Sequence, residues 1–177
     1  KAFTEYGDQQ MKAARRTYLT SRAMSELTYV ATLAGGGIGT VEAGIRGMNM
    51  AMRQLRAGSA EITREFNAMG LTLEELERLS VEDRFWRIAT AIASFEDETR
   101  RGELAMAAFS RGGMQMLPMI DMGAEAIARA RAEARRFGVS LDQETGEAAE
   151  ELTDQMFRLK MALLGIKISI ARVLAPE

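Results

Sequence analysis

The chain of 177 residues is long enough for one ordinary domain or for an extended array of helices, and its 47% hydrophobic but only 6% aromatic content favours helices over sheets. Its 23 basic and 25 acidic residues are interspersed and leave a net charge of -2. The overall charge of the chain therefore does not favour binding to nucleic acid. Cysteine and histidine are absent, which excludes disulfides, thiolate metal sites and His-dependent catalytic arrangements. We therefore predict an all-α fold.

Residues 1–58 are predicted to form a helical hairpin region. A helical pattern runs from Thr4 to Ala34, with breaks expected near Gly7 and Thr20. The corner that follows, AGGGIGT, needs residues that tolerate positive φ at the end of a helix, and it supplies Gly35, Gly36, Gly37 and Gly39. Thr40 is expected to cap the next helix, Val41 to Arg56, whose apolar residues recur at steps of four and three: Val41, Ile45, Met48, Met52 and Leu55.

Residues 59–138 are predicted to form short helices joined by turns that contain glycine. Residues able to cap a helix stand just before each apolar pattern, at Ser59, Thr72, Ser80 and Asp97. Thr72 and Glu75 also have capping-box spacing. A helix of about Glu98 to Ser110 leads into a predicted helix-turn-helix corner that comprises Arg111, Gly112, Gly113 and Pro118. An Ala-rich and Arg-rich helix, about Ala124 to Phe137, follows it.

Residues 139–177 are predicted to form one long amphipathic helix, capped by Asp142 and continuing to about Ala175. A seam typical of a coiled coil repeats along it at steps of four and three: Leu152, Met156, Leu159, Leu163, Ile166, Ile170 and Val173. A second stripe has the same period: Phe157, Met161, Leu164, Ile168 and Ala171. Because two apolar faces need two sets of neighbours, we expect this helix to contact its own chain and other copies or a partner.

Glycine loops and clustered acids are the first candidate sites, and each has a plainer interpretation. The loops AGGGIGT and SRGG follow helices and lack the Lys of a phosphate loop, so both are predicted to be structural corners. Carboxylates gather near the start of the last helix: Glu144, Glu147, Glu150, Glu151 and Asp154. They could hold a metal or serve acid–base chemistry, but they are better explained as acids that complement the helix dipole. No cofactor or metal is expected.

Basic and methionine-rich stretches are the remaining candidates. An arginine patch on the Ala-rich helix contains interspersed acids and no aromatic residues, so no specific nucleic-acid site is expected there: Arg129, Arg131, Arg135 and Arg136. The 13 methionines are expected to fill the core more than to form an adaptable binding surface. An enzyme such as a muramidase would have to use Glu74, Glu75 or Glu150, and we expect no enzymatic activity.

The order of these motifs resembles bacteriophage tail tape measure proteins. The central match is MGLTLEELERLSVEDRFWRIATAIASFEDETRRGELAMAAFSRGGMQMLPMI, Met69 to Ile120. The flanks SRAMSELTYVATLAGGGIGTVEAGIRGMNMAM and GVSLDQETGEAAEELTDQMFRLKMAL also resemble the family, so that the resemblance covers about Ser21 to Pro176. The chain departs from the family pattern at Ser110, where glycine is common, and at Trp86, where a smaller residue is usual.

What the resemblance implies is a mechanical function. Tape measure proteins are long helical chains that occupy the lumen of the growing tail tube, and their length sets its length. The implied partners are other copies of the chain, the tail tube protein, tail-tip (distal tail) proteins and tail assembly chaperones. The implied location is the virion tail, in the tube lumen or tail tip, after assembly in the host cytoplasm, and the chain leaves at genome ejection.

A membrane-active segment that assists DNA translocation is the alternative function. The most apolar run, Met161 to Ala175, is too short to span a bilayer alone and carries Lys167 and Arg172. It could instead make transient contact with a host membrane as an amphipathic helix.

Overall fold

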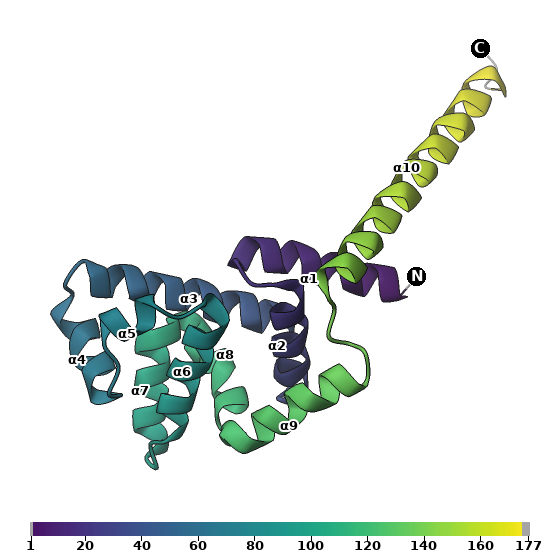
Figure 1. Cartoon of the computed structure of the whole chain (residues 1–177). Helices are drawn as coiled ribbons and strands as arrows, with labels where there is room; N and C mark the ends of the chain where they lie inside the picture. The colour runs from purple at the N-terminus through teal and green to yellow at the C-terminus, as the bar shows by residue number, and fades with distance from the viewer. Residues whose placement is uncertain (1, 175–177) are drawn as a thin grey trace.

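The computed structural model describes residues 2–174, without the side chains of residues 2–4, 143, 146 and 164–174. Every regular element in this part of the chain is an α-helix (Figure 1). The ten helices are α1 (Ala2–Thr17), α2 (Ser21–Leu33), α3 (Ile38–Arg56), α4 (Ala60–Ala68), α5 (Leu73–Glu77), α6 (Val81–Ala93), α7 (Glu98–Phe109), α8 (Arg111–Ile120), α9 (Gly123–Arg136) and α10 (Gln143–Leu174). The all-α fold predicted from composition is confirmed.

Helix α3 is the centre of a helical body that we define as α1 to α9. Helices α1, α2, α4, α7 and α8 all pack against it. The predicted apolar stripe of α3 is buried along its whole length, from Val41 to Leu55. One buried cluster continues from Ala13 to Ala130, across residue 58, where the sequence suggested a boundary between regions.

Side-chain caps determine where many of the helices begin. Five of the six predicted caps accept a hydrogen bond from the backbone N–H three residues further on, over 2.8 to 3.5 Å: Ser59, Thr72, Ser80, Asp97 and Asp142. Such a bond satisfies one of the backbone donors that a helix start leaves unpaired. The Glu75 carboxylate does not reach back to Thr72, because it accepts a 2.7 Å hydrogen bond from Arg87 Nε.

The first glycine corner ends α2 with a Schellman motif. Gly35 has a φ of +82°, and the Gly36 N–H donates to Ala31 O over 2.8 Å. The predicted cap at Thr40 is wrong, because the extended backbone of Gly37 begins α3 three residues earlier. Gly39 and Thr40 therefore lie inside α3.

The second glycine corner turns at Ser110, one residue before the predicted one. Ser110 has a φ of +52° and separates α7 from α8. Arg111, Gly112 and Gly113 form the first turn of α8, and Pro118 lies in its last turn. The glycines serve close helix contacts here, since a Cβ on Gly113 would lie 2.1 Å from the carbonyl oxygen of Ala105.

Candidate interaction surface

Helix α10 projects from the helical body as a single rod (Figure 1). Four of the predicted seam residues have described side chains, and they are 47 to 58% exposed: Leu152, Met156, Leu159 and Leu163. We call these four the α10 seam. The other predicted seam residues, Ile166, Ile170 and Val173, have side chains outside the described residues. A row of half-exposed apolar side chains on a projecting helix is typical of a surface that binds another protein.

Helix α1 crosses the N-terminal part of α10 and holds it closely. A Cβ on Gly7 would lie 2.4 Å from the Cβ of Ala149, so only a glycine permits this approach. Arg15 binds the Glu150 carboxylate through both of its terminal nitrogens, over 2.9 and 2.8 Å. The predicted break near Gly7 is wrong, because α1 is continuous and its glycine is used for contact with α10.

A buried carboxylate fixes the connection that leads into α10. Glu26, on α2, is 1% exposed. It accepts hydrogen bonds from Arg135 over 2.7 and 2.9 Å, from Arg131 over 3.1 Å and from the Ser140 hydroxyl over 3.0 Å. Next to it, Ser25 Oγ accepts the N–H of Leu141 over 2.9 Å. We call the group around Glu26 the carboxylate clamp.

Burial is the largest influence on Glu26 and raises the pKa of its carboxyl group. Hydrogen bonds from Arg135, Ser140 and Arg131 together outweigh burial, and the pKa lies below its ordinary value of 4.5. Glu26 is therefore charged at neutral pH and binds the two arginines as an anion. The clamp ties α2 to α9 and to the start of the connection to α10.

The sequence analysis did not single out Glu26 as a structural residue. The available signal was a glutamate between the apolar residues Met24 and Leu27, together with the i, i+4 pair Arg131 and Arg135. Two arginines at that spacing lie on one helix face and can converge on one acid. Only the tertiary contact between α2 and α9 shows which acid it is.

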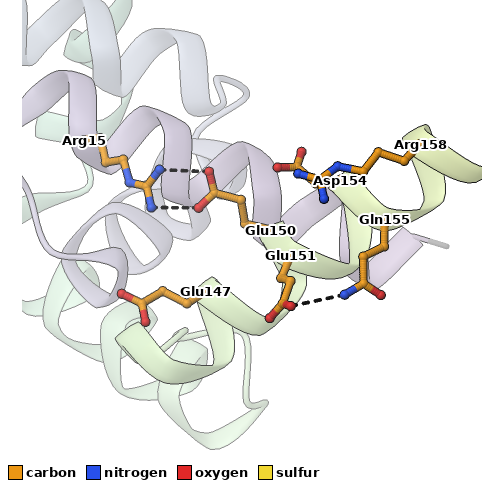
Figure 2. A pocket seen from close by; sticks show the side chains of 7 residues that line it. All are labelled: Arg15, Glu147, Glu150, Glu151, Asp154, Gln155 and Arg158. Carbon is orange, nitrogen blue, oxygen red and sulfur yellow. Dashed lines mark hydrogen bonds and ion pairs between the residues drawn. The ribbon is translucent and has the colours of Figure 1, made fainter. Parts of the chain in front are cut away.

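Four of the five acids in the predicted cluster line an open pocket of about 340 Å³ between α1 and α10: Glu147, Glu150, Glu151 and Asp154 (Figure 2). Its carboxylates do not converge on one point. Glu150 is bound by Arg15, Glu151 accepts from the Gln155 amide over 3.1 Å, and Glu147 points away from both (Figure 2). Among the described residues no group of acids is arranged to hold a metal ion.

The predicted arginine patch and the glutamates considered for an enzyme do not form one site, because their members pair with different residues. In the arginine patch, Arg131 and Arg135 belong to the carboxylate clamp, and Arg129 pairs with Glu125 over 2.6 Å. The glutamates considered for an enzyme are also ion-paired: Glu74 with Arg78, Glu75 with Arg87 and Glu150 with Arg15.

The methionines divide between two environments. Some fill the core, as predicted: Met11, Met24, Met48, Met52, Met69, Met116 and Met119. Others are exposed and leave the thioether available for contact: Met50, Met106, Met114, Met156 and Met161. The exposed set is the part that the core-filling prediction missed.

No protein-family model matches the chain, and neither a curated protein nor a solved structure does. None of the described helices has the length and apolar character needed to cross a membrane. The geometry itself therefore has to indicate what this chain does, and its most distinctive feature is the α10 seam on a helix whose start is firmly held.

Proposed function

We propose that the chain is a segment of a bacteriophage tail tape measure protein. The proposal rests on the resemblance of Ser21 to Pro176 to that family. Such a segment would help to set the length of the tail tube during assembly and would occupy the tube lumen or tail tip until genome ejection. Its partners would be other copies of the chain, the tail tube protein, tail-tip proteins and assembly chaperones.

The observation that carries the proposal is the exposure of the α10 seam. Copies that run side by side in a tube need lateral contacts, and a row of leucine and methionine side chains at steps of four and three can supply them. The firm attachment of α10 to α1 gives that row a fixed direction relative to the body. A helix used for a contact within its own chain would have this row covered.

The test of the ruler function is tail length by electron microscopy. We would delete several tens of helical residues in frame from the parent gene, away from its two ends. Tails should shorten by about 1.5 Å per deleted residue, which is the helical rise. Tails of unchanged length would contradict the ruler function.

The test of lateral association is sedimentation of the chain with Met156→Glu and Leu159→Glu. The wild-type chain should form oligomers whose fraction rises with concentration, and the variant should stay monomeric because two seam positions become charged. Arg158→Glu is the matched control, since it places a negative charge at a neighbouring position of the same helix but outside the α10 seam. Equal association of wild type and seam variant would exclude the seam as the interface.

The alternative function is a membrane-active segment, and the exposure of Phe157 and Met161, on the side of α10 opposite the α10 seam, favours it. An amphipathic helix of this kind could lie in a bilayer surface without crossing it. Leakage of liposomes caused by the wild-type chain but not by a variant with Phe157→Glu and Met161→Glu would support this function. If the chain causes no leakage and the deletions shorten the tails, the ruler function would be supported and the membrane function would not.

A further inference from the structure

A groove of about 420 Å³ lies where the α7–α8 corner meets α3. Gly47, Gly112 and the buried Phe109 line it, and so does Met50, which is 46% exposed. We call this the corner groove. Its small and apolar lining residues suit the side chain of a bound apolar residue.

The rim of the corner groove is cationic. Arg46 from α3 and Arg111 from α8 both line it, and neither makes an ion pair with any acid in the described part of the chain. Glu42, one turn before Arg46, is bound by Arg16 over 2.8 Å. The groove therefore favours a ligand that carries a carboxylate next to an apolar side chain.

A surface with this chemistry lies on α10, on the side of the helix opposite the α10 seam. Asp154, Phe157 and Met161 follow one another at steps of three and four, and we call them the α10 back face. All three are exposed, Phe157 by 61%. Residues three apart on a helix have Cβ atoms about 5–6 Å apart, so the carboxylate and the phenyl ring are neighbours.

We propose that the α10 back face of one copy binds the corner groove of the next copy. Phe157 then lies beside Met50, in a contact between sulfur and an aromatic ring. Asp154 pairs with Arg46 and Arg111. Helix α10 is directed away from α3, α7 and α8 (Figure 1), so a chain does not cover its own groove.

This contact joins two different surfaces, and it is therefore heterologous. Heterologous contacts build rings or open linear series, whereas a contact between two α10 seams joins identical surfaces. The proposal thus adds a longitudinal contact to the lateral association proposed above. It uses another face of α10, so either contact can fail without the other.

The test uses single-cysteine variants, because the natural chain has no cysteine. Ser110→Cys places a thiol in the corner groove, and Met161→Cys places one on the α10 back face while keeping Phe157. With a short bismaleimide, a mixture of the two variants should give a cross-linked dimer, and each variant alone should not. Leu33→Cys, at another exposed apolar residue, is the control that should not link to Met161→Cys.

Charge reversal then tests the recognition itself. Arg46→Glu with Arg111→Glu should lower the yield of the mixed dimer by roughly tenfold, and Asp154→Arg on the partner should restore it. Phe157→Ala should abolish the mixed dimer while the helix content stays unchanged. Linkage of Met161→Cys only to itself, or a mixed yield no higher than that of the Leu33→Cys control, would overturn the proposal.

Discussion

The two longest helices that the structure describes, α3 and α10, are held in opposite ways. Helix α3 packs against α2, α7 and α8. Gly47 lets the end of α7 approach the backbone of α3, and Gly112 lets α8 do so. Helix α10 is held at its N-terminal part only, and the α10 seam beyond it is exposed. The helical body thus buries its apolar side chains in one continuous cluster, whereas α10 carries a row of apolar side chains that the chain itself leaves exposed.

The largest expected effect comes from breaking the backbone contact of α3. In Gly47→Ala the new Cβ would lie 1.8 Å from the carbonyl oxygen of Phe109, so α3 and α7 must separate. We expect unfolding in urea to show a loss of about 3 kcal/mol or more, since overpacking against backbone cannot be relieved by a rotamer change.

The matched control lies in the same helix. Gly39→Ala adds a Cβ with no other atom within 4 Å. It should raise stability by about 0.5 kcal/mol, because alanine is a better helix former than glycine. Equal effects of the two substitutions would show that the glycines matter for helix propensity and not for close approach.

Much of this fold could be predicted from the sequence, because its signals are local. Caps such as Ser80 and Asp97 act on N–H groups three residues away, and the apolar stripe of α3 follows helical spacing. Gly35 ends α2 as predicted, but Gly7, Gly112 and Gly113 were misread, because a position without a Cβ looks the same in sequence whether it serves a turn or a helix contact. Gly7 and Gly113 serve contacts that only tertiary structure reveals.

The α10 seam could also be predicted because its signal is local, but the contacts that attach α10 to the helical body could not. The spacing of the α10 seam can be read from the sequence, and so can that of Ile166, Ile170 and Val173, whose side chains lie outside the described part. The carboxylate clamp depends on residues more than 100 positions apart, such as Glu26 and Arg135. No local pattern fixes which partner a buried charge will have.

The second prediction concerns the carboxylate clamp. Glu26→Gln keeps the size of the side chain but removes the charge that binds Arg131 and Arg135. We expect a loss of about 2 kcal/mol at pH 7, below that of a fully buried pair because both arginines can regain water. Glu125→Gln, which breaks an exposed pair on α9, should change stability by less than about 0.5 kcal/mol.

The difference in unfolding free energy between the wild type and Glu26→Gln should depend on pH. The pKa of Glu26 is lowered by folding, so its contribution is complete above its ordinary value of 4.5 and is lost as the pH falls through the lower folded value. Unfolding free energies of wild type and Glu26→Gln should therefore converge below pH 4.5. A constant difference down to acid pH would mean that the charge of Glu26 does not stabilise the fold.

The third prediction tests the contact of α1 with α10. Gly7→Ala should cost about 1 to 2 kcal/mol, because its new methyl group overlaps that of Ala149. Adding Ala149→Gly removes the overlapping methyl group and should recover most of the loss in urea unfolding. Failure of the second substitution to rescue the first would mean that Gly7 acts through its backbone and not through the contact.

The smallest effect is expected for the ion pair at the same junction. Arg15 is largely exposed while Glu150 is mostly covered, so salt and water screen their attraction. A double-mutant cycle with Arg15→Ala and Glu150→Gln should give a coupling of about 0.5 kcal/mol that falls as salt is added. The contact of both Arg15 terminal nitrogens with the Glu150 carboxylate therefore fixes the orientation of α10 more than it stabilises the fold. A coupling larger than the effect of Gly7→Ala would reverse this order and make charge, instead of close packing, the main attachment of α10.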